Sequence, residues 1–290
     1  MLLNRLHEQL LLRPEDVPPS RADFEVVGAF NPGAVLAGQE VVLLVRVAER
    51  PREQRLGFTG LPRWTADGEL LIDWVADEEL EPIDPRVVRR KADGLVRLTF
   101  TSHLRAVRCG DGRGVREVTS STFLPSSEME EYGVEDPRIS FLNGRYYFTY
   151  VAVSRHGAAT ALASTADFKS FERHGVVFCC ENKDVVLFPE KIGGDYVALH
   201  RPNPATPFCR PEMWIARSSD LTHWGHHGVL HGGGGDWETG RVGAGTPPVR
   251  VANGWLEIYH GSQHTTAKGA VGKYSTGALL LHPDGPSRIL

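Results

Sequence analysis

Short runs of β-branched and aromatic residues recur along the chain, and each run follows a turn pair. Such a run reads as the second strand of a β-hairpin, because tight hairpin turns favour residues that tolerate positive φ angles. The turn pairs recur about every 50 to 60 residues and are Ala37-Gly38, Asp93-Gly94, Asn143-Gly144, Gly193-Gly194 and Asn253-Gly254. The pattern predicts an all-β chain built from five similar units.

A second repeat supports this organisation. Residues 163–171 resemble residues 216–224, which lie 53 positions later, and residues 64–68 form a weaker copy. In the two clear copies Asp167 and Asp220 flank a turn, where their side chains are expected to bind backbone amides and so to be structural. Self-similarity of this period in strand-rich sequence is typical of β-propellers, whose blades bury their faces against neighbouring blades. We therefore predict a five-bladed β-propeller over residues 21–290.

Helical periodicity is confined to the N-terminus. The apolar residues from Leu2 to Leu12 predict one amphipathic helix that ends at Pro14. We expect residues 1–20 to form a helical extension that packs on the propeller or mediates association, which leaves a homo-oligomer open.

Composition narrows the classes of function. The 290 residues are 41% hydrophobic and 23% charged, as in folded globular proteins. The 32 Lys and Arg against 36 Asp and Glu give a net charge of −4, so no basic field is available for nucleic acid. The sequence has neither an apolar run of about 18 residues for a membrane span nor a secretory signal pattern. Its four cysteines lack metal-binding spacing. These features favour a cytoplasmic protein that holds no metal.

Polar residues near the start of each predicted unit identify a candidate site. A propeller gathers the first strand of every blade around one axis, so these residues converge on a central funnel. Two of the segments carry Asp-Pro-Arg, at Asp84 to Arg86 and at Asp136 to Arg138, and a salt-bridged scaffold is an open alternative for Asp84. The segments are 30–33, 83–86, 134–138, 182–191 and 243–248.

Four motifs, in this order, resemble glycoside hydrolase family 130, the β-mannoside phosphorylases and β-mannosidases. They are GVEDPRI at 133–139, NKDVVLFPEK at 182–191, LHRP at 199–202 and WLEIYHG at 255–261, within a resemblance that extends from about Asn31 to Leu281. The resemblance implies a five-bladed propeller that cleaves β-mannosides, such as mannosyl-glucose or manno-oligosaccharides, by inverting phosphorolysis. The product is α-mannose 1-phosphate, and inorganic phosphate is a co-substrate with no further cofactor.

The resemblance also assigns roles to single residues. Asp136 matches the family's acid, which is thought to protonate the glycosidic oxygen through the 3-hydroxyl of the sugar, and phosphate attacks without a catalytic base. Arg and His are the donors that suit phosphate oxygens. The implied phosphate ligands are Arg201 and His260, with Arg241, Lys183 and Tyr274 as further ligands, and Lys183 is alternatively a partner of Asp184. The implied mannose-binding residues are Asn31, Arg46, Asp84, Arg138, Asp184 and His200.

The sequence departs from the family pattern in two places. About 105 residues separate Asn31 from Asp136, and an extra hairpin unit with Asp84 and Arg86 lies between them. The family's usual final blade, which carries a mannose-binding Asp, has no match here. The blades then close in a shifted order or the chain is incomplete, and Asp84 is expected to replace the missing Asp.

Two other functions stay open at this stage. An inverting hydrolase would use a glutamate base opposite Asp136, and the candidates are Glu181, Glu212 and Glu257. A propeller also serves as a carbohydrate-binding platform without catalysis. Retention of Arg201 and His260 favours phosphorolysis, whereas the acceptor sugar and the linkage are not specified by the sequence.

Overall fold

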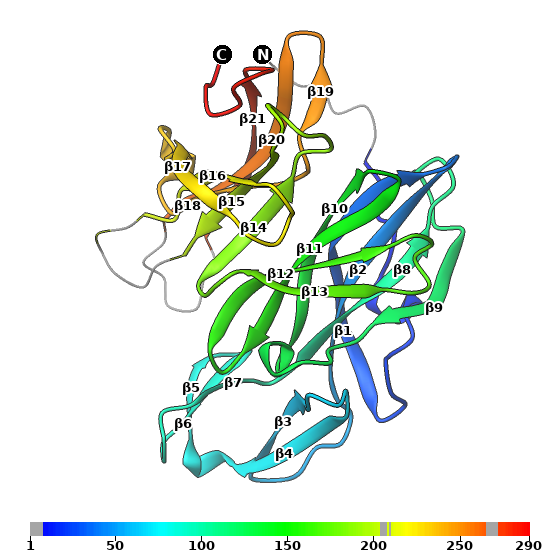
Figure 1. Cartoon of the computed structure of the whole chain (residues 1–290). Helices are drawn as coiled ribbons and strands as arrows, with labels where there is room; N and C mark the ends of the chain where they lie inside the picture. Colours follow the sequence, from blue (N-terminus) through cyan, green and yellow to red (C-terminus); the bar gives the residue numbers. More distant parts are fainter. Residues whose placement is uncertain (1–7, 204–207, 209, 265–271) are drawn as a thin grey trace.

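Antiparallel strands make up nearly all of the regular structure in the computed structural model, which describes residues 8–203, 208, 210–264 and 272–290 (Figure 1). The chain forms four successive four-stranded blades, which we number I to IV. Four short 3₁₀ helices interrupt the strands: η1 (Pro14–Asp16), η2 (Asp77–Glu79), η3 (Glu128–Glu130) and η4 (Asp236–Glu238). No helix in the described ranges has the length and apolar character needed to cross a bilayer.

Blades I and II share one eight-stranded sheet. Blade I contains β1 (Phe24–Ala37), β2 (Glu40–Pro51), β8 (Thr101–Arg108) and β9 (Glu117–Phe123). Blade II contains β10 (Gly133–Leu142), β11 (Arg145–Ser154), β12 (Gly157–Thr165) and β13 (Glu172–Phe178). A single parallel bridge between Gly133 and Ser102 joins β10 to β8. Apolar residues of both blades form one core cluster around Leu44, Leu104 and Phe148, so the two blades are packed as one unit.

Blades III and IV are separate four-stranded sheets. Blade III contains β14 (Asn182–Leu187), β15 (Tyr196–Pro202), β16 (Met213–Ser218) and β17 (Gly225–His231). Blade IV contains β18 (Arg241–Ala244), β19 (Val249–Val251), β20 (Gly254–Ser262) and β21 (Tyr274–Leu281). Both β18 and β19 pair with β20, as two halves of one broken strand. Phe188 of blade III packs edge-on against Trp255 of blade IV inside their shared core.

An insertion between β2 and β8 corrects one sequence prediction. It contains β3 (Phe58–Trp64), β4 (Leu70–Ala76), β5 (Leu80–Asp84), β6 (Val87–Arg90) and β7 (Val96–Leu98), in two small sheets of their own. The Asp93-Gly94 turn lies between β6 and β7, so this hairpin belongs to the insertion and not to a blade. In Figure 1 the insertion (cyan) lies at the opposite end of the molecule from blade IV (orange to red).

The predicted structural role of Asp167 and Asp220 is confirmed. Asp167 Oδ1 accepts hydrogen bonds from the backbone of Lys169 at 2.9 Å and Ser170 at 3.0 Å, and Asp220 Oδ1 accepts the corresponding bonds from Thr222 and His223. These bonds close the turn between the third and fourth strands of blades II and III.

The N-terminal helix is not found in the described residues. Residues 1–7 lie outside them, and residues 8–13 have no regular secondary structure. Leu11 and Leu12 nevertheless pack against the apolar face of blade I formed by Leu43, Val45 and Val47. The contact of these leucines with the blade stabilises the segment in an irregular conformation. A helix of this length is not stable by itself, because helix formation needs more than a single favourable turn.

Candidate active site

The first strand of each of blades I to III is interrupted by a polar residue with positive φ. These residues are Asn31 at 46°, Asp136 at 50° and Asp184 at 55°. The pairing register shifts at each of them, between Phe30 and Gly33, Glu135 and Arg138, and Lys183 and Val186. A β-bulge turns side chains out of the regular alternation of a strand, and Asn and Asp tolerate the left-handed conformation well. Each bulge therefore places one polar side chain at a corresponding position in the first strand of its blade.

The first group of site residues surrounds Asp136. Its Oδ1 accepts hydrogen bonds from Arg46 Nη1 at 3.0 Å and from Asn31 Nδ2 at 3.1 Å. Arg46 also donates to Glu135 Oε1 at 2.6 Å and to Ser102 Oγ at 3.2 Å, which fixes the guanidinium between two carboxylates. The side chain of Asp136 is 22% exposed and that of Arg46 10%, so the carboxyl is the accessible member. The structure thus brings together three residues that the sequence analysis had singled out.

The second group lies around Asp184, where blades III and IV meet. Asp184 Oδ2 accepts a hydrogen bond from Arg201 Nε at 2.7 Å and forms an ion pair with His260 Nε2 at 3.3 Å. Burial alone would raise the pKa of Asp184, but the charge of Arg201 and the contact with His260 outweigh it and hold the pKa far below its usual range. The ring of Tyr274 lies 5.7 Å from that of His260, centroid to centroid. This cluster therefore contains an arginine, a histidine and a tyrosine around a permanently ionised carboxylate.

Gly243 explains how blade IV approaches this cluster. A Cβ atom at this position would collide with Asp184 Oδ2 and would come within 3.0 Å of His260 Cε1. Only glycine leaves room for the Asp184 carboxylate against β18. Gly243 begins one of the segments predicted to converge on the funnel, but its role depends on a contact between blades that the sequence does not show.

The remaining predicted phosphate ligands lie on strands that contribute to the second group. Lys183 is paired in register with Arg201, and Arg241 begins β18 opposite Ser262. Arg138 lies between the two groups, because its Nη1 donates to the carbonyl oxygens of Asp136 at 3.2 Å and Pro137 at 3.1 Å while its charge lowers the pKa of Asp184.

Two predicted mannose-binding residues lie outside both groups. His200 contacts Asn182 through Nδ1 at 3.0 Å and His227 through Nε2 at 3.1 Å, and its ring stacks on Phe178. Burial and the neighbouring His227 lower the pKa of His200 to about 3, so the imidazole is neutral at physiological pH. Asp84 caps its own turn in the insertion, where it accepts a 2.7 Å hydrogen bond from the Arg86 backbone. No contact joins either residue to Asp136 or Asp184 in the part of the chain that the structure describes.

The three glutamates considered as hydrolytic bases have different surroundings. Glu257 is fully buried in blade IV, and burial raises its pKa well above the usual range. Glu181 accepts a 2.9 Å hydrogen bond from the Ala158 backbone and lies beside Asn203, which in turn binds Arg201. Glu212 lies against Gly232. Over the ranges described, no group of three or more His, Cys, Asp or Glu side chains is arranged to hold a metal ion.

Sequence comparisons show where this chain is similar to known proteins. A family model described as beta-1,4-mannooligosaccharide phosphorylase, of glycoside hydrolase family 130, matches residues 108–290. The beta-1,2-mannobiose phosphorylase of Listeria innocua serovar 6a is 38% identical over the whole of this chain and 81% of its own length. The beta-1,4-mannooligosaccharide phosphorylase of Ruminococcus albus is 35% identical over 57% of this chain and 48% of its own.

Solved structures agree with these matches. The Listeria innocua beta-1,2-mannobiose phosphorylase in complex with beta-1,2-mannobiose superposes with a TM-score of 0.85 at 39% identity, over 96% of this chain and 78% of that one. A thermostable family-43 glycoside hydrolase has a TM-score of 0.56 at 13% identity over 94% of this chain and 74% of that one, which is a likeness of fold alone. The predicted all-β fold is confirmed, and it resembles folds of the five-bladed propeller type; the described residues form four blades and the insertion. The chain belongs to glycoside hydrolase family 130.

Proposed function

We propose that this protein is an inverting β-mannoside phosphorylase. The observation that carries the proposal is the separation of the site into an accessible carboxyl, Asp136, and a second cluster in which Arg201 and His260 face Asp184; both Asp136 and Asp184 lie at the bulges of first strands. One group suits a proton donor and the other suits a phosphate ion. The phosphorylase names of the relatives support the same reaction.

In the proposed reaction the mannosyl unit lies between the two groups. Asp136 gives up a proton, which reaches the glycosidic oxygen through the 3-hydroxyl of the mannose, and the bond between that oxygen and the anomeric carbon breaks. A phosphate oxygen forms its bond to the anomeric carbon from the opposite face of the ring, so the product is α-mannose 1-phosphate. Asn31 and Arg46 orient the carboxyl. Inorganic phosphate is the co-substrate, and the reaction requires no other cofactor.

In this scheme the groups that bind phosphate already face the negative charge of Asp184. Arg201 and His260 donate toward the phosphate oxygens, with Tyr274, Lys183 and Arg241 as neighbouring donors. Charge-assisted bonds of this kind are about twice as strong as neutral ones. A donor set of this composition needs no glutamate base, since the phosphate itself is the nucleophile.

The deciding experiment is incubation with β-1,2-mannobiose, β-1,4-mannobiose and mannosyl-glucose, with and without phosphate. We expect mannose 1-phosphate only when phosphate is present. Free mannose released at the same rate without phosphate would contradict the proposal and indicate a hydrolase.

The Asp136→Asn variant tests the acid. We expect kcat to fall by about 10²–10⁴-fold, because that is the usual contribution of a positioned proton donor. The circular dichroism spectrum and the Tm should stay close to those of the wild type. Retained activity in this variant would refute the assignment of Asp136.

A further inference from the structure

Two hollows lie along blade I and the insertion, and Arg46 of the acid site lines the first of them. The first has a volume of about 340 Å³, and the residues that line it include Phe30, Arg46 and Phe100. The second has a volume of about 290 Å³ and includes Arg55, Phe58 and Trp74 in its lining. Arg50, Pro85 and Thr99 line both hollows, so the two are adjacent, and together they are called the groove below. Because Arg46 also donates to Asp136, one side chain separates the first hollow from the carboxyl of the acid site.

The chemistry of the first hollow suits a sugar. The Arg46 guanidinium lies over the ring of Phe30 at 4.9 Å and near that of Phe100 at 6.0 Å. Phe30 is 40% exposed, which leaves part of its ring accessible. Carbohydrate rings present apolar C–H faces that pack on aromatic rings, while their hydroxyls accept hydrogen bonds from guanidinium groups.

The charges along the groove favour a neutral ligand over an anion. Arg50 is paired with Glu25 at 2.7 Å, Arg55 with Glu53 at 2.8 Å, and Arg86 with Asp84 at 3.4 Å. Each guanidinium outside the acid site thus already has its own carboxylate partner, unlike the second group, where the single carboxylate of Asp184 faces both Arg201 and His260. An uncharged polyhydroxyl chain gains hydrogen bonds there without competing for an unmatched positive charge.

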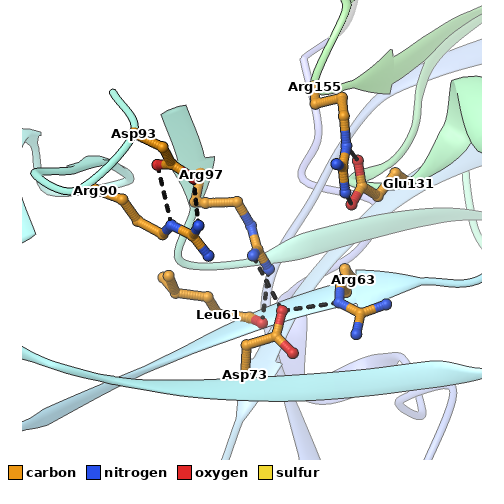
Figure 2. Close-up of polar contacts among 8 residues, drawn as sticks. All are labelled: Leu61, Arg63, Asp73, Arg90, Asp93, Arg97, Glu131 and Arg155. Carbon is orange, nitrogen blue, oxygen red and sulfur yellow. Dashed lines mark hydrogen bonds and ion pairs between the residues drawn. The ribbon is translucent and has the colours of Figure 1, made fainter. Parts of the chain in front are cut away.

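The insertion forms a rigid wall for the second hollow. Arg97 is only 3% exposed and donates to Asp73 Oδ2 and to the Leu61 carbonyl oxygen, both at 3.0 Å, and Asp73 also accepts from Arg63 at 2.8 Å (Figure 2). These bonds tie β3 and β4 to β7, and the Arg97 guanidinium lies 5.3 Å from the ring of Tyr132, just before β10. Trp74, next to Asp73, is therefore held at a fixed position relative to the strand that carries Asp136.

We propose that this groove binds the leaving side of a manno-oligosaccharide, with one sugar unit in each hollow. The inference rests on the proposed function, because the proton of Asp136 reaches the leaving oxygen through the 3-hydroxyl of the mannosyl unit, and the leaving chain must extend from the unit that lies beside Asp136. The first hollow takes the unit directly after the cleaved bond, and the second hollow, at Trp74, takes the next. A disaccharide fills only the first hollow, whereas a trisaccharide fills both, so the insertion makes the enzyme prefer longer chains.

The test compares phosphorolysis of di-, tri- and tetrasaccharides of the linkage that the protein cleaves. For the wild type we expect kcat/KM to rise by about tenfold from disaccharide to trisaccharide and to change little beyond it. Trp74→Ala should abolish the rise and leave the disaccharide value unchanged. Arg55→Ala, at an exposed position that stacks on Trp74 at 4.2 Å, should reduce the rise without risk to folding. Phe141→Ala, at an exposed aromatic on blade II, is the matched control and should keep the wild-type ratio.

The outcomes separate this inference from the proposed function. Equal kcat/KM for all chain lengths in the wild type, or an equal loss at every length in Trp74→Ala and Arg55→Ala, would overturn the groove while phosphorolysis stands. If no β-mannoside is phosphorolysed, the proposed function fails. Isothermal titration of mannotriose and mannobiose into the wild type and Trp74→Ala then decides the groove, which requires tighter binding of mannotriose in the wild type alone.

Discussion

Two buried carboxyl groups, Asp184 and Glu257, have opposite electrostatic surroundings. Asp184 has Arg201 and His260 within 3.3 Å, and its pKa is held low. Glu257 accepts one long bond, 3.4 Å from the Gly245 backbone, and its Oε2 has no hydrogen-bond partner in the part of the chain that the structure describes. Burial without a charge partner favours the neutral acid, whereas burial beside an arginine favours the anion. Burial raises the pKa of Glu257 although the charge of Arg138 opposes it, which favours the neutral acid and makes Glu257 a poor base.

Glu257→Gln tests this conclusion. The folded-state pKa of Glu257 is raised above the unfolded value of 4.5, so its contribution to stability falls as pH rises above 4.5. We expect the variant to unfold at a higher temperature than the wild type at pH 8 and at a similar temperature at pH 4, with kcat unchanged. A kcat reduced by 100-fold or more at unchanged Tm would instead identify Glu257 as a catalytic base.

The buried pair of Arg201 and Asp184 makes a second prediction at the residue scale. Arg201→Gln leaves Asp184 without its main partner in a buried position, and we expect a loss of about 3–5 kcal/mol in the free energy of unfolding. The double variant Arg201→Gln with Asp184→Asn removes both charges and should recover most of that loss. Both variants should raise the KM for phosphate by more than about tenfold, as expected when a charged donor worth at least 1.4 kcal/mol is lost. A normal phosphate KM in the double variant would exclude Arg201 as a phosphate ligand.

At the scale of elements, turn chemistry was predictable and sheet membership was not. The Asn143-Gly144 and Gly193-Gly194 pairs connect strands of blades because the residues that permit a tight turn are local. The Asp93-Gly94 pair has the same local signal, yet its strands join the insertion, because pairing partners are chosen by contacts distant in sequence. The bulges at Asn31 and Asp136 were signalled only by the following proline, and the one at Asp184 had no signal.

His200 and Arg201 are neighbours in β15, and the mannose-binding role of His200 stays a prediction. Neighbouring residues in a strand point to opposite faces, so His200 and Arg201 of β15 are not expected to share one site. In the structure Arg201 accordingly lies in the Asp184 cluster, whereas the ring of His200 stacks on Phe178. Resemblance identified the motif, but strand periodicity decides which of its residues face the funnel.

Gly133 controls how β10 begins and is the subject of a third prediction. Its φ is +127°, and a Cβ there would lie 2.6 Å from the backbone nitrogen and 2.8 Å from the backbone oxygen of Ser102. Backbone atoms in a bridge cannot move aside, so Gly133→Ala should cost at least about 1–3 kcal/mol of stability. It should also displace Asp136, three residues later, and a 1 Å misplacement of a reacting group costs about 100-fold in rate.

Gly144→Ala is the matched control for this element. Gly144 also has a positive φ, of +80°, but nothing lies within 4 Å of its ideal Cβ. We expect the control to lose only the stability that an alanine with positive φ costs, measured by chemical unfolding. Its kcat, measured from initial rates, should stay unchanged. If Gly133→Ala and Gly144→Ala lose equal activity, the position of β10 does not govern the acid.

At the scale of the whole molecule, the site is divided between two halves of the blade order. The Asp136 group is built from blades I and II, which share one sheet, and the Asp184 group is built from blades III and IV, which share only a packed core. Arg138 of blade II extends toward the second group through its charge. An anion bound at Arg201 and His260 would therefore contact both separate sheets and favour their closed arrangement.

This arrangement predicts that phosphate stabilises the folded protein. A ligand that binds only the native state adds about 2.7 kcal/mol at a concentration of 100 times its Kd, which corresponds to a rise of several degrees in Tm for a chain of this size. The measurement is thermal unfolding in phosphate against chloride of equal ionic strength. Asp136→Asn should show the full rise, because it leaves the anion cluster intact, whereas the double variant at Arg201 and Asp184 should show none. An equal rise in all three proteins would indicate a general salt effect on the surface and would count against an anion site between blades III and IV.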